Sequence, residues 1–454
     1  MAARPKAQQQ TPAERREYGR GLRAAVPRSI QARWDPPSAR RDPVLVLEEQ
    51  EAGRVHELLP IRHGRMIASA LAFLRGAAAV MAEDLAGTPV SGLRVQACGD
   101  AHLLNFGIFA TPERRLDFDV NDFDETLPAP FEWDVKRLAA SVVVAGRARG
   151  FSAAECDEAG RAAAASYRSQ MGDCAAMSYL DVWYARLDVS ELMASMRKAD
   201  SRRLQDDVLA KARRKTSLGA LAKLTEVVEG RRRIVDAPPL VEHLEWPAGA
   251  PSPPLVVRRY RRSLPDDRRV LLDRYRVLDW ARKVVGVGSV GTDDAIVLAQ
   301  GDTDGDPLFL QVKEAQASVL ERFAGSSRYA THGQRVVWGQ RIMQAASDIF
   351  LGWTSLGDRD YYVRQLRDMK GSIAVEKLSP RELLDYARAC GGALGLAHAR
   401  SGDPASIAGY LGAGDNFDRA IAGFASAYAD QTERDHALLV HAARSGRIEA
   451  APAA

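Results

Sequence analysis

The sequence predicts a two-lobed α+β fold, in which a mostly helical larger lobe faces a smaller lobe built on an antiparallel sheet. The chain has 454 residues, which is too many for one small core. Apolar residues recur at helical spacing through much of residues 44–236, whereas residues 255–371 hold strand-like runs separated by Gly-Asp turns. A proline-rich break at residues 237–254 separates the two patterns.

Five segments follow from these patterns. Residues 1–43 are rich in Arg, Gln, Pro and Ala and hold few large apolar residues, which is typical of a flexible basic arm. After this arm we predict a helical lobe at residues 44–236, a linker at residues 237–254 and a sheet lobe at residues 255–371. Residues 372–454 are predicted to be C-terminal helices that pack on the helical lobe.

Charge and composition exclude several classes of partner. The 63 Lys and Arg residues against 59 Asp and Glu give a net charge of +4, so neither a nucleic acid nor a membrane surface is expected. No apolar run approaches the ~20 residues of a membrane helix, and the N-terminus lacks the apolar core of a secretory signal. The four cysteines form no CxxC pair, which favours free thiols in a reducing compartment. We therefore expect a cytoplasmic protein without a membrane span, and the sequence holds no signal of its oligomeric state.

Helix and strand patterns alternate in the first half of the chain. Ile61–Leu85 carries apolar residues at helical spacing and is predicted to be one long, buried helix. Short strands are predicted at Leu93–Ala97 and Arg115–Val120, and Trp133–Ala145 is predicted to be a helix with its apolar face inward. Residues 151–235 are predicted to be helical throughout.

Strand signals dominate the second half up to about residue 371. The Gly-Asp-rich turn at residues 301–307 joins two apolar runs and predicts an antiparallel hairpin. We also expect a strand that runs into a glycine loop at residues 277–292 and a helical stretch at residues 318–352. A strand that runs into a turn is expected at residues 360–371, and helices are expected at residues 379–454.

Two acidic motifs carry the first chemical signal. Gly-Asp-Ala-His-Leu-Leu-Asn stands at residues 99–105, and Asp-Phe-Asp-Glu follows at residues 122–125. Phosphoryl transfer needs a carboxylate beside the attacking hydroxyl, and it needs an amide oxygen and a second carboxylate to hold Mg²⁺ against the nucleotide phosphates. Asp100 suits the first task as the candidate catalytic residue, and Asn105 and Asp122 suit the second. Oxygen ligands without a Cys or His cluster favour Mg²⁺ over zinc.

Neighbouring residues leave alternatives open. Asp124 is a further candidate metal ligand, whereas Asp117 and Asp119 lie in the same stretch but share one face of a strand. We prefer Asp122 because it follows the apolar strand, where a loop can present it. His102 is a second candidate catalytic residue, although a buried histidine with a structural hydrogen bond is the simpler interpretation.

A glycine-rich loop follows much later in the chain, at residues 286–291, with Gly286, Gly288, Ser289 and Gly291 as candidates for nucleotide binding. A dinucleotide-binding loop would open a helix directly after its glycines. Here a strand-like run follows instead. A glycine loop between two strands is the arrangement of protein kinases, in which backbone amides lie over the phosphates of ATP. ATP is therefore expected as the cofactor, together with Mg²⁺.

Lys313 lies on an apolar strand two strands after the glycine loop, where it would pair with the phosphates as a point charge. A surface lysine on an alternating strand is the alternative. Its acidic partner stays open, because Glu321 is available and Glu314 is close in sequence. Residues 360–371 then have the character of the strand and hinge beside an adenine pocket, where the backbone at Leu366 would bind the edge of the base.

The acidic motifs resemble those of a known superfamily. Residues 99–105 resemble the GDxHxxN catalytic loop of the aminoglycoside phosphotransferase and choline kinase branch of the protein-kinase-like superfamily, and the motif that begins at Asp122 resembles its metal-binding DF motif. The resemblance implies a protein-kinase-like fold, with Asp100 as the catalytic aspartate and with Asn105 and Asp122 as Mg²⁺ ligands. It also implies that Asp134 braces the catalytic loop.

The chain from about Pro43 onward also resembles an uncharacterised bacterial family that carries a domain of unknown function. The segments that carry this resemblance are CGDAHLLNFG, NDFDETLPAPFEWDVKRLAAS and AASDIFLGW, which begin at Cys98, Asn121 and Ala345. The resemblance implies a shared fold and identifies no substrate.

The order of the motifs differs from that of ordinary kinases, in which the glycine loop and the lysine come first. Here Lys313, in the nucleotide-binding lobe, comes 213 positions after Asp100. A circular permutation is the simplest explanation, because kinase-like termini can be rejoined at exposed sites. An alternative keeps the ordinary order by placing the catalytic loop at His398–Asp403, with Asp415 as the metal ligand. This alternative has Ala408 where the asparagine belongs.

The sequence thus predicts an ATP- and magnesium-dependent phosphotransferase that acts on an unidentified small-molecule or protein hydroxyl. Two alternatives share the fold, namely a nucleotide-binding pseudokinase or regulatory module, and an enzyme that transfers AMP from ATP. A third alternative is a dinucleotide-dependent oxidoreductase built on the glycine motif. It needs a helix directly after Gly291 and an acidic ribose ligand about twenty residues further on.

Overall fold

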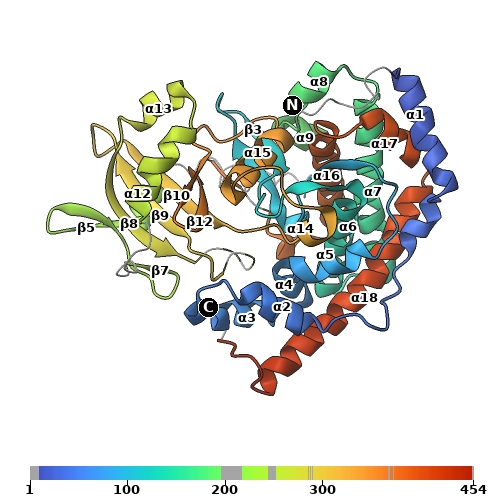
Figure 1. Cartoon of the computed structure of the whole chain (residues 1–454), viewed down its shortest axis with the longest axis horizontal. Coiled ribbons are helices and arrows are strands. Elements are labelled where there is room, and N and C mark those ends of the chain that lie inside the picture. The colour runs from blue at the N-terminus through green and yellow to red at the C-terminus, as the bar shows by residue number, and fades with distance from the viewer. Residues whose placement is uncertain are drawn as a thin grey trace.

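The largest antiparallel sheet and the long helices occupy opposite sides of the molecule (Figure 1). Figure 1 shows the largest sheet on the left and a group of long helices on the right. The predicted mixed α+β class is therefore confirmed. The structure is a computed structural model, and it describes residues 10–195, 217–243, 252–284, 286, 288, 290–366, 369–371 and 373–451.

The largest sheet has six strands, and every neighbouring pair is antiparallel. The predicted hairpin is confirmed, because Pro307 lies opposite Gln300 and Val312 lies opposite Ala295. In spatial order the strands are β11 (Gly352–Leu356), β12 (Arg359–Gln365), β10 (Pro307–Ala315), β9 (Ala295–Gln300), β8 (Arg276–Lys283) and β7 (Val241–Glu242).

Both faces of this sheet are covered, because apolar side chains alternate between them. Val297 and Leu310 point to the face that packs on α12 (Pro253–Tyr260). Phe309, the neighbour of Leu310, points to the other face and packs near α11 (Ser217–Leu224). The sheet is thus fixed from both sides, and its β10 strand is buried along most of its length.

The helical side is built from α6 (Phe131–Ala148), α7 (Ala153–Cys174), α16 (Pro380–Ala399), α17 (Pro404–Leu411) and α18 (Asn416–Arg444). Capping boxes start α7 and α16, in which a serine at the N-cap and a glutamate three residues later satisfy each other's backbone amides. These helices confirm the predicted helix at residues 133–145 and the predicted C-terminal helices.

Two small two-stranded sheets carry the loops that hold the acidic motifs. The strands β1 (Arg94–Ala97) and β4 (Leu127–Pro130) pair with each other, as do β2 (Phe106–Ala110) and β3 (Leu116–Val120). The predicted strands at residues 93–97 and 115–120 are confirmed as β1 and β3. The loop after β1 contains the first motif, and the loop after β3 contains the second.

The predicted helix Ile61–Leu85 is instead three short helices, α3 (Leu59–Met66), α4 (Ala70–Gly76) and α5 (Ala78–Ala86). The chain is extended at Ser69, whose side chain caps α4 by accepting from the amide of Ala72. Apolar spacing alone did not reveal this break, because the apolar residues continue in phase on both sides of the cap.

The prediction of helix throughout residues 151–235 is wrong at its end. The strands β5 (Thr225–Val228) and β6 (Arg231–Ile234) form a hairpin. Glu229 and Gly230 join them, and both have positive φ angles, of 51° and 73°. Two consecutive positive φ angles are typical of the tight turn that matches the twist of a hairpin. The run of charged residues before it, residues 196–216, lies outside the described residues.

The N-terminal arm differs from the flexible segment that its composition predicts. From residue 10 onward it holds α1 (Pro12–Gly21), and α2 (Pro43–Glu51) follows it. Arg15 forms an ion pair of 2.7 Å with Asp403, and the arm lies along α17. The arginines that make the arm basic also donate to carbonyls at the end of α17, and these polar contacts hold a segment that has little apolar surface.

The remaining described helices connect these parts. The predicted linker, residues 237–254, includes β7 and the start of α12, and its residues 244–251 lie outside the described part. The predicted helical stretch at residues 318–352 contains two helices and ends before β11. The helices not yet introduced are α8 (Tyr179–Tyr184), α9 (Val189–Ser195), α13 (Asp266–Leu272), α14 (Glu321–Ala324) and α15 (His332–Met343).

The prediction about the cysteines finds support. All four cysteines are buried and free, as their scattered positions predict. Over the described ranges, no helix combines the length and the apolar character that crossing a bilayer demands.

Replacing Gly391 with alanine is expected to lower the free energy of unfolding by about 1–3 kcal/mol, because the new methyl group overfills a packed contact. A Cβ on Gly391 of α16 would lie 2.1 Å from the carbonyl oxygen of Ala163 on α7. The control is Gly172→Ala on α7, where a Cβ meets nothing within 4 Å and the helix gains up to about 1 kcal/mol. Chemical denaturation measures both variants, and effects of the same sign would contradict this packing.

Candidate functional site

The acidic motifs and the glycine motif line the same cavity, although they lie far apart in the sequence. Two pockets, with volumes of about 40 Å³ and 300 Å³, adjoin each other. Asp100 and Asp122 line the smaller pocket. The residues shared by both pockets are Gln50, Asp124, Glu125 and Gly288.

The loop that carries Asp100 is fixed by its backbone. Gly99 has a φ angle of 82°, and a Cβ there would lie 2.3 Å from the carbonyl oxygen of Glu125, so a glycine is needed. Asp134, in the first turn of α6, accepts hydrogen bonds from the amides of Cys98 and Gly99, at 2.6 and 3.0 Å. His398 Nε2 lies 3.1 Å from the same carboxylate. Asp134 therefore braces the loop, as the sequence resemblance implies.

Asp100 faces a buried arginine. The Nε of Arg137 donates to Oδ1 of Asp100 at 2.5 Å, and a second guanidinium nitrogen contacts the same oxygen. Burial raises the pKa of Asp100 to about 7, and Arg137 opposes this shift. A carboxylate with a pKa in this range is suited to exchanging a proton with a hydroxyl group near neutral pH.

Asn105 and His102 hold the loop together from within. The side-chain amide of Asn105 donates to the carbonyl of Asp100 at 2.8 Å, which directs the amide oxygen elsewhere. His102 Nδ1 accepts from the amide of Leu104 at 3.2 Å and so caps the 3-10 helix at Leu103–Asn105. Burial lowers the pKa of His102 well below its usual value, and the arginines nearby act in the same direction. His102 thus has the structural hydrogen bond that the sequence left as the simpler alternative.

Lys313 of β10 reaches across to the second acidic motif. Its Nζ lies 2.5 Å from Oδ2 of Asp124, and the hydroxyl of Tyr362 on β12 donates to Oδ1 of Asp124 at 2.6 Å. Burial lowers the pKa of Lys313, but the surrounding acidic groups, with Asp124 first among them, together outweigh it and the net shift is upward. Burial raises the pKa of Asp124, but Lys313, Tyr362 and Arg364 together outweigh it and the net shift is downward. Both groups therefore stay charged.

The acidic partner of Lys313 is thus neither of the two glutamates that its sequence position offers. Glu314 accepts from the amide of Asp293 at 3.0 Å, and Glu321 lies 3.8 Å from Arg335. Asp122 lies beside Asp124 and remains in the pocket, where burial and the charge of Asp124 raise its pKa. The two aspartates of the motif therefore have different surroundings.

The metal ligands expected from the sequence divide accordingly. Both oxygens of Asp124 are engaged, by Lys313 and Tyr362, whereas Asp122 lines the smaller pocket and Asn105 lines neither of the two pockets. Within the described ranges, no three His, Cys, Asp or Glu side chains are grouped so as to hold a metal ion. One carboxylate and one amide oxygen fit Mg²⁺, which usually takes few protein ligands and completes its shell with phosphates and water.

The glycine loop is anchored on its outer side. Arg62 donates to the carbonyl of Gly288 at 3.1 Å, and Arg54 donates to that of Val290 at 2.6 Å. The amide of Val55 donates to the carbonyl of Gly291 at 2.7 Å.

The conformation of the loop supports only part of its predicted role. Gly291 has a φ angle of 91°, which favours glycine. The strand β9 follows it, so the helix that a dinucleotide loop requires is not there. Gly288 lines the cavity, Gly286 lies close to Arg75, and Ser289 lies outside the described residues.

Leu366 does not join the other predicted residues. Its amide donates to the carbonyl of Phe309 at 2.9 Å, which extends the β12–β10 ladder by one bond. Leu366 lines neither of the two cleft pockets. Residues 367 and 368, where the sequence places the hinge, lie outside the described residues.

The alternative catalytic loop at His398–Asp403 has structural roles. His398 lies on α16 and contacts Asp134 behind the acidic loop. Arg400 is buried and donates to the carbonyls of Met343 and Ala185. Asp403 caps α17 and pairs with Arg15. None of the residues from His398 to Asp403 lines either of the two cleft pockets.

Sequence patterns did not reveal the arginines of the cleft. Arg137 follows Asp134 by three residues on α6, so the helical spacing offered a signal for it. Arg54, Arg62 and Arg75 lie in the segment around α3 and α4, which carries no motif. Only the folded structure shows that these three arginines all lie close to the glycine loop.

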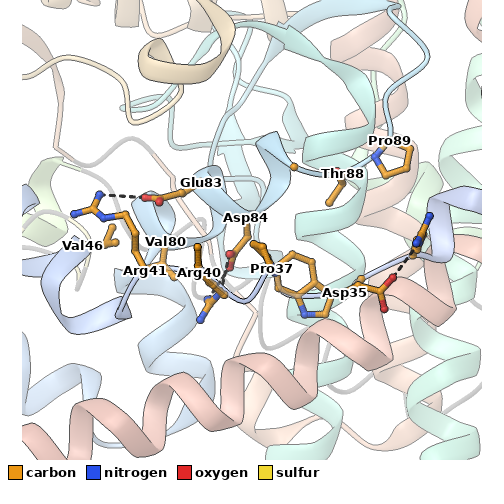
Figure 2. Close-up of a pocket in the computed structure, with 14 residues that line it drawn as sticks. Asp35, Pro37, Arg40, Arg41, Val46, Val80, Glu83, Asp84, Thr88 and Pro89 are labelled. Carbon is orange, nitrogen blue, oxygen red and sulfur yellow. Dashed lines mark hydrogen bonds and ion pairs between the residues drawn. The ribbon is translucent and has the colours of Figure 1, made fainter.

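A further pocket, of about 410 Å³, lies apart from this cleft. Figure 2 shows it beside α18, with Arg40 directed at Asp84 and Arg41 directed at Glu83. Trp34 forms one wall and packs edge-on against an aromatic ring of α18. Because these arginines are already paired, the pocket lacks the charge that a nucleotide phosphate needs, and we assign it no part in the site.

One comparison with known proteins gives a result. A family described as an uncharacterized protein conserved in bacteria (DUF2252) matches residues 54–442, which is most of the chain and includes both acidic motifs and Lys313. No curated protein and no solved structure matches the chain. The function must therefore be argued from the geometry of the site.

Substituting Asp134 with asparagine is expected to lower the free energy of unfolding by about 2–3 kcal/mol, because two amides lose a charged acceptor. The control is Asp157→Asn on the exposed surface of α7, which should change the free energy of unfolding by less than about 0.5 kcal/mol. Urea titrations followed by circular dichroism measure both. Equal stability of the two variants would show that Asp134 does not brace the loop.

Asp100 is expected to titrate near pH 7 in the folded protein, about three units above an exposed aspartate. Because the folded state keeps the proton to higher pH, this group lowers stability as the pH rises from about 4 to 7. Carbon-13 NMR of the carboxyl group measures the pKa, and Arg137→Gln should raise it further. A pKa near 4 in the wild-type protein would refute the burial argument.

Proposed function

This chain belongs to the DUF2252 family of uncharacterised bacterial proteins, and we propose that it is an ATP- and magnesium-dependent phosphotransferase with a protein-kinase-like fold. The observation that carries the proposal is the contact between Lys313 of the sheet and Asp124 of the acidic loop, at the wall of one cavity. Kinases use a lysine and an acidic metal-binding motif at the phosphates of the nucleotide. In this chain a lysine and an acidic motif meet at one cavity, which supports the proposal.

The order of strands supports the kinase-like interpretation. In protein kinases the glycine loop comes first and the lysine lies on the third strand. Here the glycine loop follows β8, and Lys313 lies on β10, two strands later in the same sheet. The catalytic loop precedes this sheet in the sequence, so we propose that the fold is circularly permuted.

The residues of the cleft take distinct roles in this proposal. Asp100 orients the acceptor hydroxyl and accepts its proton. Asn105 and Asp122 would hold Mg²⁺, which supplies positive charge for the phosphates when it is bound. Lys313 neutralises phosphate charge, and Asp124 positions Lys313. The amides of the glycine loop lie over the phosphates.

The acceptor is a hydroxyl group of a small molecule or a protein, and we place the reaction in the cytoplasm. The same cleft suits transfer of AMP in place of the terminal phosphate, because both reactions use ATP, Mg²⁺ and an acceptor hydroxyl. Mass spectrometry of the protein and of candidate acceptors after incubation with ATP separates the two. Nucleotide binding without either product would indicate a pseudokinase.

Replacing Asp122 with asparagine is expected to abolish most of the gain in ATP affinity that Mg²⁺ gives, a loss of about tenfold or more, because a charged metal ligand is removed. Asp302→Asn, on the exposed β9–β10 turn, serves as the control and should bind as the wild type does. Calorimetric titration of ATP with and without Mg²⁺ measures the effect. The proposal fails if the wild-type protein does not bind ATP, or if Asp122→Asn keeps the full gain.

A further inference from the structure

Arg75 brings a positive charge into the cleft from a segment without any motif. It lies in the last turn of α4, and it lines the small pocket together with Asp100 and Asp122. Its Nη2 lies 4.0 Å from the position of a Cβ built on Gly286. Its backbone carbonyl oxygen lies 3.8 Å from the position of a Cβ built on Gly288. The side chain therefore sits between the glycine loop and the catalytic loop.

Three other cations of the cleft each have an acidic partner, and Arg54 donates to the backbone carbonyl of Val290. Arg137 pairs with Asp100, Lys313 with Asp124, and Arg62 with Glu51 at 2.9 Å. These contacts satisfy the charge that burial would otherwise make costly.

Arg75 differs from these cations. Its Nε is buried without an acceptor, and no described residue forms an ion pair or a hydrogen bond with its side chain. The guanidinium has five donors, so a half-buried arginine in this state is prepared for an acidic group that comes from outside the chain.

We propose that Arg75 binds the terminal phosphoryl group of the nucleoside triphosphate. The inference rests on the proposed function and adds a residue to it. Arg75 lies at the Asp100 end of the cavity, where the acceptor hydroxyl would be, whereas Lys313 lies at the Asp124 end. The planar fork of an arginine fits two oxygens of a phosphate, and positive charge at this position stabilises the group that is transferred.

The test compares nucleotides that differ in their terminal phosphate. Calorimetry with Mg²⁺ measures the affinities of the wild-type protein, Arg75→Ala and Arg75→Lys for a non-hydrolysable ATP analogue and for ADP. We expect Arg75→Ala to bind the ATP analogue about 10- to 100-fold more weakly and to bind ADP within about twofold of the wild type. Arg75→Lys keeps the charge but loses the fork, so we expect an intermediate loss. Arg322→Ala, an exposed arginine of α14, is the control.

The outcomes separate the two proposals. If the wild-type protein binds neither nucleotide, the proposed function and the role of Arg75 both fail. If it binds both nucleotides and the alanine variant loses them equally, or loses neither, the proposed function stands and the assignment of Arg75 is overturned. The unfolding temperature of each variant is measured beside its affinity, and Arg75→Lys decides the matter if Arg75→Ala does not fold.

Discussion

The ion pair between Lys313 and Asp124 is the interaction on which the arrangement of the cleft depends. It joins the sheet to the acidic loop across 189 positions of sequence. Lys313 is almost fully buried, and Tyr362 completes the shell of the carboxylate. Loss of one partner from such a pair leaves a buried charge alone, which typically costs about 3–5 kcal/mol. The two sides of the molecule are therefore coupled at the point where the proposed nucleotide would lie.

The segment around α3 and α4 completes the cleft, although it belongs to neither motif. It supplies Arg54 and Arg62 to the glycine loop and Arg75 to the cavity. It contacts the glycine loop and also lines the pocket that holds Asp100, so it lies between the two motif-bearing loops.

Much of the fold could be predicted from local patterns, and the errors have physical causes. The β9–β10 hairpin followed from its Gly-Asp turn, and α6 followed from its apolar face. The break at Ser69 and the β5–β6 hairpin were missed, because a cap and a turn of two residues leave little trace in hydrophobic periodicity. Short motifs led to the acidic residues and to Lys313. No pattern within one element predicts that Asp124 is the partner of Lys313, or that Arg75 enters the cavity, because these contacts are made between distant segments.

The outer anchoring of the glycine loop also fixes which way its peptide groups point. In a trans peptide, the carbonyl of one residue and the amide of the next are directed oppositely. The carbonyls of Val290 and Gly291 are turned toward Arg54 and Val55, so the amides of Gly291 and Thr292 are turned away from that segment. The connection between α2 and α3 thus sets the direction of these peptide dipoles and turns two backbone amides of the loop away from itself.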